Sequence, residues 1–395
     1  MAKPQIRLKG FEGEWENVCF KDFSYPAGEK NRDNLPLESY SISNEFGFVP
    51  QNEQFEKGGT MANADKRMYY IVKPDSFAYN PARINVGSIG YDNLDKDVIV
   101  SSLYVIFKTD SETNNEWLNI WFKTPYFKRL VELYQEGGVR LYFFYDKLCA
   151  CHLNRPLLME QKAIADYFKS LDSMLQSTTK KIESLKQMKS ACLVSMFPQA
   201  GETTPRVRFK GFEGKWGYSS LGEIFEERVE SNIYGEMLSV TMNNGVIKAS
   251  ENGRFDNSNS DKSKYKVVKV NDIAYNSMRM WQGASGCSQY EGIVSPAYTV
   301  VVPCEGIDSL FFSYMFKTLP MITLFRLHSQ GLTSDTWNLK YPAFSKIKVI
   351  YPKEIQEQQR IASYFRSLDK QISLQEQKLE KLKQIKAACL DKMFV

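Results

Sequence analysis

The stretch EQKAIADYFKSLDSMLQSTTKKIESLKQMKSACLVSMF, residues 160–197, returns as EQQRIASYFRSLDKQISLQEQKLEKLKQIKAACLDKMF at residues 357–394. At this offset of 197 the two stretches agree at 20 of 38 positions, far more than chance allows. Neither copy contains proline or glycine, and apolar residues recur at alternating steps of three and four, which predicts two long amphipathic helices. The chain is therefore an internal duplication.

The apolar spacing is a heptad repeat, and a seam of this kind needs a partner helix to cover it. The nearest partner of each helix is the other copy, and their order along the chain makes that pair antiparallel. The alternative is that each helix packs only on its own domain. Polar residues interrupt the stripes at matching places, Thr178 with Gln375 and Lys189 with Lys386, where they would fix the register. The predicted coiled-coil residues are Ile164, Phe168, Leu171, Leu175, Ile182, Leu185, Ile361, Phe365, Leu368, Ile372, Leu379 and Leu382.

The composition is that of an ordinary globular protein. The chain has 395 residues, of which 43% are apolar and 13% aromatic, enough for two or three packed domains. No apolar run approaches the roughly 20 residues of a membrane span, and the opening Met1-Ala-Lys-Pro resembles no signal or transit peptide. We therefore expect a cytoplasmic protein with no membrane partner, whose seven cysteines are thiols, mostly buried.

The net charge of +5 permits an acidic partner such as nucleic acid without requiring one. Much of the positive charge falls on the outer faces of the two predicted helices, at residues such as Lys180 and Lys378. A solvated helix face is the simpler interpretation of those lysines. Charge alone therefore does not identify a partner.

The duplication extends into the globular parts. Arg7-Leu-Lys-Gly-Phe-Glu-Gly-Glu-Trp15 returns as Arg208-Phe-Lys-Gly-Phe-Glu-Gly-Lys-Trp216, and Ala78-Tyr-Asn80 returns as Ala274-Tyr-Asn276. Gly137 corresponds to Gly331, while the residues between these anchors differ nearly everywhere. Two versions of one reader, with a shared frame and divergent surface residues, would show this pattern.

Short β-branched and aromatic runs alternate with helical stretches, so the predicted fold class is α+β with an internal pseudo-two-fold repeat. Residues 98–107, for example, are expected to form a strand, and residues 116–134 and 309–327 to form helices that bend at Pro125 and Pro320. The proline and glycine residues after position 197 predict a linker. The expected order is a first domain over 1–158, a helix over 159–197, a linker over 198–206, a second domain over 207–355 and a helix over 356–395.

Motifs of catalysis are incomplete in this chain. Asn80-Pro-Ala-Arg83 matches only two of four positions of the Asn-Pro-Pro-aromatic loop of adenine methyltransferases, and no Phe-x-Gly-x-Gly turn for S-adenosylmethionine is present. A P-loop is absent, and no Asp/Glu-x-Lys follows Pro74-Asp75 at the spacing of a nuclease. Cys149-Ala-Cys-His152 is half a zinc site without a second pair of ligands, so buried thiols are expected there. We predict no catalytic residues and no metal site.

The repeated Asn-x-x-Arg segments carry residue types that suit nucleic acid. Arginine can form two hydrogen bonds with guanine or contact a phosphate, and asparagine and glutamine can pair with adenine edges. The alternative is a structural turn whose arginine pairs with a local carboxylate. Chosen by residue type, the candidate DNA-binding residues are Asn80, Arg83, Asn85, Arg140, Asn276, Arg279, Gln282, Thr333 and Ser334.

Together, the Lys-Gly-Phe-x-Gly-x-Trp openings, the Ala-Tyr-Asn-x-x-Arg segments and the paired Glu-Gln-x-x-Ile-Ala-x-Tyr-Phe-x-Ser-Leu-Asp helices resemble the specificity subunit of type I restriction-modification systems. The resemblance covers essentially the whole chain. It implies two target-recognition domains that each read half of a bipartite site in double-stranded DNA, with the helices as the spacer between them.

The resemblance also implies partners and cofactors. Two methyltransferase (modification) subunits would dock on the conserved regions, together with restriction subunits that supply the motor and the nuclease. S-adenosylmethionine, ATP and magnesium would then belong to those partners. The competing hypotheses are a non-catalytic coiled-coil scaffold or adaptor without DNA contact, and a fused methyltransferase fragment.

Overall fold

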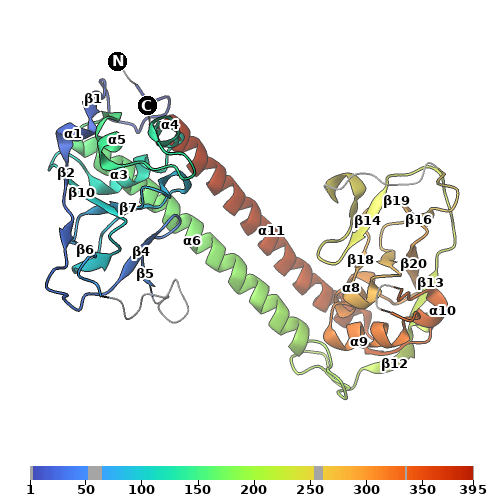
Figure 1. Ribbon diagram of the computed structural model, residues 1–395. Helices are drawn as coiled ribbons and strands as arrows, with labels where there is room; N and C mark the ends of the chain where they lie inside the picture. Colours follow the sequence, from blue (N-terminus) through green and yellow to red (C-terminus); the bar gives the residue numbers. More distant parts are fainter. Residues whose placement is uncertain (1–2, 52–64, 253–260, 334–335, 395) are drawn as a thin grey trace. The chain divides into compact units, whose positions relative to one another are not determined.

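The structure, a computed structural model, describes residues 3–51, 65–252, 261–333 and 336–394 (Figure 1). The chain divides into two compact units: unit 1 comprises Met1–Thr179 and Gln377–Val395, and unit 2 comprises Lys180–Glu376. Both divisions fall inside the long helices α6 (Leu158–Ser195) and α11 (Ile355–Lys392). Each unit therefore holds one globular domain and a part of each long helix.

The domain of unit 1 consists of short strands and short helices. Its strands are β1 (Glu16–Cys19), β2 (Ser24–Pro26), β3 (Glu29–Lys30), β4 (Tyr40–Ser43), β5 (Gly47–Pro50), β6 (Tyr70–Val72), β7 (Phe77–Tyr79), β8 (Ile89–Tyr91), β9 (Val98–Val100), β10 (Val105–Thr109) and β11 (His152–Arg155). Its helices are α1 (Phe20–Phe23), η2 (Ile84–Val86), α3 (Asn115–Trp121), α4 (Pro125–Tyr134) and α5 (Tyr145–Cys149). The central antiparallel sheet has the order β2-β10-β7-β8, beside a sheet β3-β6-β9, a hairpin β4-β5 and the pair β1-β11.

The domain of unit 2 repeats this arrangement. Its strands are β12 (Gly217–Ser220), β13 (Phe225–Glu227), β14 (Leu238–Thr241), β15 (Gly245–Lys248), β16 (Lys266–Val268), β17 (Ile273–Asn276), β18 (Ser285–Cys287), β19 (Gly292–Val294), β20 (Tyr298–Pro303) and β21 (Lys348–Tyr351). Its helices are α7 (Leu221–Ile224), η3 (Ala249–Asn252), η4 (Met280–Gln282), α8 (Ser309–Met315), α9 (Leu319–His328) and α10 (Tyr341–Phe344). The central sheet has the order β13-β20-β17-β18, with the hairpin β14-β15 and the pairs β16-β19 and β12-β21.

The structure confirms the α+β fold, the internal repeat and the helix interruptions. Both predicted helical stretches break where proline begins a new helix, at the start of α4 and at the second residue of α9. The single strand expected over 98–107 is wrong, because a turn separates β9 from β10. The amide of Tyr104 donates to the carbonyl of Ser101 at 3.1 Å, which reverses the chain. Ser102 and Leu103 of that turn line a cleft.

The long helices pair in an antiparallel manner within each unit. In unit 1 the carboxylate of Asp172 contacts the ammonium of Lys386, and the hydroxyl of Tyr167 lies 3.7 Å from the thiol of Cys389. Unit 2 makes the same two contacts with exchanged partners: Lys189 with Asp369 at 2.5 Å, and Cys192 with Tyr364 at 3.4 Å. The lysines expected to fix the register therefore form ion pairs across the seam. Of the twelve predicted seam residues, ten are buried, and Leu175 and Leu379 are half-buried.

Each domain core includes the end of the helix that belongs to the other copy. In unit 1 the ring of Phe394, just after α11, lies 6.4 Å from Trp117 and 6.0 Å from Phe168 of α6. In unit 2 Phe197, just after α6, lies 5.4 Å from Phe311 and 5.9 Å from Phe365 of α11. The alternative that each helix packs only on its own domain is therefore wrong.

A buried ion pair explains why the opening motif and the helix motif are both repeated. Glu160 at the start of α6 accepts two hydrogen bonds of 2.8 Å from the guanidinium of Arg7 and one of 3.2 Å from the indole of Trp15. Glu357 accepts the same set from Arg208, at 2.6 and 2.7 Å, and from Trp216 at 3.3 Å. The opening segment is thereby held against the first turn of the helix in both units.

The glutamine of each Glu-Gln pair connects the helix to the domain. Gln161 accepts from the amide of Asn114 at 2.7 Å and donates to the carbonyl of Pro156 at 2.8 Å. Gln358 accepts from the amide of Asp308 at 2.9 Å and donates to Pro352 at 2.9 Å. Both side chains are buried, so these motif residues stabilise the fold rather than face a ligand.

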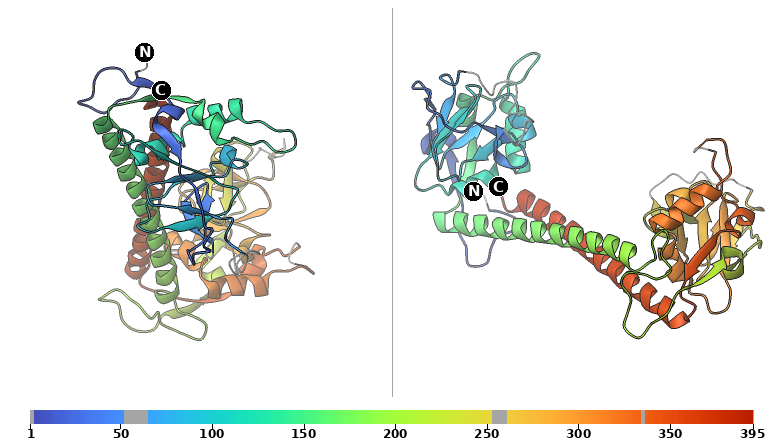
Figure 2. Two further views of the ribbon diagram at one scale, coloured as in Figure 1. Left: turned by 60° about the vertical axis from the view of Figure 1, so that its left-hand side comes forward. Right: turned by 90° about the horizontal axis from the view of Figure 1, so that it is seen from below.

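The two ends of the described chain lie side by side in unit 1, as both views of Figure 2 show. The amide of Ile6 donates to the carbonyl of Lys392 at 3.0 Å, and in unit 2 the amide of Val207 donates to Ser195 at 2.9 Å. Within the described part of the chain, none of the helices combines the length and the apolar character of a membrane span.

Candidate nucleic-acid interface

The Asn-x-x-Arg segments form tight turns at the end of a central strand in each domain. The side-chain oxygen of Asn80 accepts from the amide of Ala82 at 3.0 Å, and that of Asn276 accepts from Met278 at 3.0 Å. The amides of Arg83 and Arg279 donate to the backbone carbonyls of the same asparagines at 3.0 Å. The asparagine is thus engaged in the turn, as Asx turns require.

The tyrosine before each asparagine belongs to the core. Tyr79 and Tyr275 are fully buried, and the ring of Tyr275 stacks 5.1 Å from Phe344. Burial raises the pKa of both phenols far above their usual range. The repeated Ala-Tyr-Asn sequence is therefore explained by packing and turn geometry, which leaves the arginine as its exposed member.

Both arginines project from the start of a short 3-10 helix that ends on a glycine. Arg83 precedes η2 and Arg279 precedes η4, and the closing residues Gly87 and Gly283 have φ values of 89° and 83°. Both arginine side chains are exposed. Arg279 donates to the side-chain oxygen of Gln282 at 3.3 Å. Neither guanidinium forms an ion pair with a carboxylate of the described residues, so these contacts do not support the structural alternative for the turn.

In unit 1 the turn forms one wall of a cleft of about 620 Å³. The cleft brings together three of the candidates, Asn80, Arg83 and Arg140, which come from two separate loops. Asn85 is exposed on η2 but does not line the cleft. The lining is completed by Pro81, Ala82, Ser102, Leu103, Tyr142 and Phe144.

Two aromatic rings form the opposite wall of this cleft. Tyr142 and Phe144 stack with their centroids 5.4 Å apart and their planes 3° from parallel. Between them, buried Phe143 donates its amide to the carbonyl of Pro81 at 3.0 Å, which fixes this wall to the turn. Phe144 is exposed and Tyr142 is half-buried. Stacked, accessible aromatic rings beside two guanidinium groups are a surface on which a base or a deoxyribose can pack.

A glycine allows the loop before the aromatic wall to close. Gly137 has φ of 140°, and a Cβ atom there would lie 2.1 Å from the carbonyl oxygen of Arg140. Gly331 in unit 2 has φ of 143°, and its Cβ would lie 2.6 Å from the carbonyl oxygen of Thr336. The matched glycines therefore reflect the same tight loop in both domains.

Unit 2 has an equivalent cleft of about 310 Å³ with different side chains. The amide of Leu339 donates to the carbonyl of Ser277 at 2.8 Å, which is the counterpart of the bond between Phe143 and Pro81. This bond places Asn338 and Lys340 where unit 1 has Tyr142 and Phe144. Pro296 and Ala297 stand where unit 1 has Ser102 and Leu103. The residues that line it are Glu227, Lys266, Ser277, Met278, Pro296, Ala297, Thr299, Asn338, Lys340, Tyr341 and Pro342.

The unit 2 candidates lie around this cleft rather than in it. Arg279 precedes η4 and Gln282 is its last residue. Trp281 lies between them, and its indole donates to the carbonyl of Met278 at 3.0 Å. Thr333 shares hydrogen bonds with Thr336 inside its own loop, including one of 3.1 Å from its amide. Asn276 is engaged in the turn described above, and Ser334 lies outside the described residues.

Sequence reasoning missed the aromatic wall and its counterpart in unit 2. The repeat offset is 194 at Gly137 and Gly331 but 196 at Phe143 and Leu339, because the unit 2 loop is longer by two residues. That slip hides the equivalence of Tyr142 with Asn338. The alternation of half-buried Tyr142 and exposed Phe144 around a buried phenylalanine in Tyr-Phe-Phe-Tyr is the signal that could have revealed it.

The thiols of two cysteines near His152 contact backbone carbonyls. The thiol of Cys19 contacts the carbonyl of Cys149 at 3.1 Å, and that of Cys151 contacts the carbonyl of Lys147 at 3.3 Å. Burial raises the pKa of Cys151 to about 12, so this thiol is protonated at neutral pH. Among the residues that the structure describes, no cluster of three or more histidine, cysteine or acidic side chains has a metal-binding arrangement.

Comparison with known proteins places this architecture in a family. Residues 213–384 match the model of the type I restriction modification DNA specificity domain. No curated protein sequence matches the chain. Among solved structures, a type I restriction-modification S subunit from M. genitalium is similar, with 15% identity and a TM-score of 0.58, over 100% of this chain and 99% of that chain.

Two further structures share the fold. The HsdS subunit from Thermoanaerobacter tengcongensis has 14% identity and a TM-score of 0.51, over 96% of both chains. A chain from a structure of type I R-M complex assembly and conformational transition has 12% identity and a TM-score of 0.52, over 96% of this chain and 97% of that one. Residues 213–384 therefore form a type I restriction-modification DNA specificity domain, and the whole chain has the fold of the type I specificity subunits that its duplicated motifs resemble.

Proposed function

We propose that the chain reads DNA for a type I restriction-modification complex, with each domain reading one half of a bipartite site. The observation that carries this proposal is the duplicated cleft. Its backbone frame is the same in both units, down to the turn, the glycine-closed loop and the hydrogen bond that joins them. Only the side chains that line it differ, as expected of two readers with different targets.

The chemistry of the two clefts predicts different half-sites. In unit 1, Arg83 and Arg140 can each donate two hydrogen bonds to guanine, while Leu103 and the aromatic wall offer apolar contact to a thymine methyl. In unit 2, Asn338 can pair with the adenine edge, and Lys340 can donate to guanine or to a phosphate. Reading through unit 1 therefore depends more on apolar contact than reading through unit 2.

The proposal assigns catalysis to other chains. Two modification subunits would dock on the repeated helices and carry S-adenosylmethionine, and restriction subunits would bring ATP and magnesium. The paired helices would then set the number of unread base pairs between the half-sites. The matched family model describes a DNA specificity domain, which supports a non-catalytic role for this chain.

The test is methylation mapping of a complex assembled with the cognate modification subunits. Placing the unit 2 residues in the unit 1 cleft, with Tyr142→Asn and Phe144→Lys, should change or relax one half of the methylated sequence and leave the other half intact. The matched exchange in unit 2, Asn338→Tyr with Lys340→Phe, should affect only the opposite half. Changes in both halves, or in neither, would contradict independent reading by the two clefts.

A scaffold without DNA contact makes a different prediction. A DNA reader loses affinity steeply as salt concentration rises, because phosphate contacts release bound counterions. Measuring binding of the assembled complex to its methylated sequence between 50 and 200 mM salt therefore separates the two functions. A complex that binds no DNA at low salt would leave the scaffold as the better account.

A further inference from the structure

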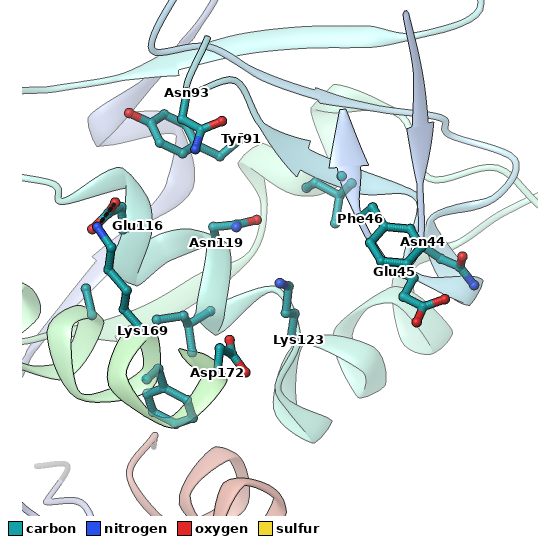
Figure 3. Close-up of a pocket in the computed structure, with 15 residues that line it drawn as sticks. Asn44, Glu45, Phe46, Tyr91, Asn93, Glu116, Asn119, Lys123, Lys169 and Asp172 are labelled. Atoms are coloured by element: carbon teal, nitrogen blue, oxygen red, sulfur yellow. Dashed lines mark ion pairs between the residues drawn. The ribbon is translucent and has the colours of Figure 1, made fainter. Parts of the chain in front are cut away.

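Each unit has a second cavity, on the other side of the turn that carries the arginine. The cavity lies among the hairpin turn, a short helix of the domain and a long helix. In unit 1 these elements are the β4-β5 turn, α3 and α6, around about 360 Å³ (Figure 3). In unit 2 they are the β14-β15 turn, α8 and both long helices, around about 740 Å³. The two cavities occupy equivalent places in the repeat but differ in charge.

The unit 1 cavity has more carboxylates than cations. Glu45, Glu116 and Asp172 line it together with Lys123 and Lys169 (Figure 3). The ammonium of Lys169 lies 3.7 Å from the carboxylate of Glu116. Asp172 is paired with Lys386 of α11 across the helix seam. This cavity therefore offers no excess of positive charge to a ligand.

The unit 2 cavity has four cations and one carboxylate. Lys189, Lys317, Arg366 and Lys370 line it together with Asp369. Asp369 is already occupied, because it accepts from Lys189 at 2.5 Å and from the hydroxyl of Tyr314 at 2.8 Å. Arg366 and Lys370 are exposed and form no ion pair with any of the described residues.

Three equivalent positions account for the difference, and all three change in the same direction. Glu45 in the first hairpin turn corresponds to Asn243, and Glu116 of α3 corresponds to Leu310. Ser173 of α6 corresponds to Lys370 of α11. Relative to unit 1, unit 2 has lost two carboxylates and gained one ammonium group. A shared structural role for the cavity gives no reason for such a coordinated change, whereas binding of an anion does.

Lys317 connects the unit 2 cavity to the arginine turn. Its ammonium donates to the carbonyls of Met242 at 2.9 Å, Ser285 at 2.8 Å and Gly283. Gly283 closes η4, and Arg279 opens it. Burial and the nearby charge of Lys189 lower the pKa of Lys317 to about 8. The positive charge therefore sits directly behind the segment that carries Arg279.

We propose that the unit 2 cavity binds a phosphate group of the DNA backbone through Arg366 and Lys370, and that the unit 1 cavity does not. This inference rests on the proposed function. Phosphate contacts position a protein on DNA without reading its sequence, and they favour guanidinium and ammonium groups together with neutral donors. Asn243, Asn244 and Gln289 supply such amide donors in the same cavity. Unit 2 thus has a phosphate contact that unit 1 lacks.

The test compares salt dependence in three variants of the assembled complex. Arg366→Gln with Lys370→Ser removes both cations that would bind the phosphate in unit 2, so the slope of log affinity against log salt should become shallower by about one. Affinity should fall equally for cognate and non-cognate DNA, and the methylated sequence should not change. Lys169→Gln, at the position equivalent to Arg366, should leave the slope unaltered because its charge is already paired in unit 1.

The reciprocal variant tests for a gain. Glu45→Asn with Ser173→Lys gives the unit 1 cavity two of the unit 2 residues, and the slope should steepen by about one. Thermal unfolding midpoints that match the wild type show that the variants fold. An unaltered slope in the unit 2 variant overturns the inference. Normal DNA binding with loss of modification-subunit assembly also overturns it, because the cavity would then bind an acidic protein segment. A wild-type complex without salt-dependent DNA binding would instead contradict the proposed function itself.

Discussion

The two units have one backbone plan but different surfaces, and the boundary between shared and divergent residues follows the structure closely. Shared residues hold the opening segment to the helix, close the turns and fill the core, as Glu160, Gln161 and Gly137 do in unit 1. Divergent residues line the two cavities on either side of the arginine turn. In the clefts the aromatic pair of unit 1 is replaced by amide and amine groups, and in the second cavity unit 2 has two fewer carboxylates and one more cation. The duplication has thus kept a frame while each copy acquired its own binding chemistry.

The strongest test of independent readers changes the helices between them. Deleting residues 180–186 with 377–383 removes seven residues from each helix and keeps the heptad phase. At about 1.5 Å per residue this shortens the pair by roughly 10 Å, or about three base pairs. Methylation mapping should show both half-sites unchanged with a shorter gap. Deleting four residues from each helix puts the seam out of phase, and activity should then be lost; an unchanged gap after the seven-residue deletion would show that the helices do not measure DNA.

Replacing the phenylalanine that follows each long helix should destabilise one unit at a time. Phe394→Ala removes a ring from the core of unit 1, and Phe197→Ala removes its equivalent from unit 2. Because such truncations leave cavities, each should lower the free energy of unfolding by about 3 to 5 kcal/mol. Amide hydrogen exchange should show lost protection in the affected domain: around Trp117 for the first variant and around Phe311 for the second. Loss confined to the opposite domain would contradict the exchanged packing.

The arginines of the two turns should differ in which half-site they affect. Arg83→Ala and Arg279→Ala should each weaken specific DNA binding by about 1 to 3 kcal/mol, because a guanidinium that contacts a base edge is lost. Measuring the affinity for DNA that is altered in one half-site at a time shows which half each arginine reads. Arg129→Ala on the exposed face of α4 serves as a matched control that removes an exposed arginine away from the cleft. Unchanged affinity in both turn variants would place the reading elsewhere.

The smallest expected effect concerns a buried carboxylate that only unit 1 possesses. Burial raises the pKa of Asp92 to about 6, and the equivalent residue in unit 2 is Ser288. The folded state therefore binds more protons than the unfolded state between about pH 4 and 6, so stability from this group is present at low pH and is lost as pH rises through 6. Asp92→Asn should abolish that slope in unit 1.

At pH 7.5 the same substitution should stabilise unit 1 by about 1 kcal/mol, because an ionised carboxylate is no longer buried; part of that gain is lost because the new amide still lacks a hydrogen-bond partner. Urea unfolding at pH 5, 6 and 7.5 measures both effects, with hydrogen exchange to assign them to unit 1. A stability profile with the wild-type pH slope would show that Asp92 is not the group that titrates.

The amino-acid sequence was sufficient for the repeat, the helices and their pairing, because a heptad stripe without breakers has few other solutions. It was insufficient for the roles of the matched residues. Glu160 and Trp15 are 145 positions apart, so only the fold reveals that they meet. The sequence predicted Asn80 as a DNA contact because asparagine can pair with adenine. In the structure its side-chain oxygen accepts a hydrogen bond within the turn, and the sequence does not distinguish these two uses.

The binding surfaces were the hardest part to predict. Arg83 and Arg140 were chosen by residue type, and they meet at one cleft because the bond from Phe143 to Pro81 brings their loops together. Tyr142 and Phe144 were missed because aromatic residues usually indicate core, and their exposure is decided by tertiary packing. The charge contrast between the second cavities depends on hairpin residues whose equivalence becomes visible only through strand pairing.

The exchange of helix ends also determines when each domain can be finished during synthesis. Unit 2 is one continuous stretch, Lys180–Glu376, whereas unit 1 needs Gln377–Val395 in addition to the first 179 residues. The first 179 residues are made before unit 2, yet the ring of Phe394 that fills the core of their domain is made after the whole of unit 2. Unit 1 is therefore completed only once unit 2 has been synthesised, and until then an unfilled apolar site stays exposed beside Trp117 and Phe168.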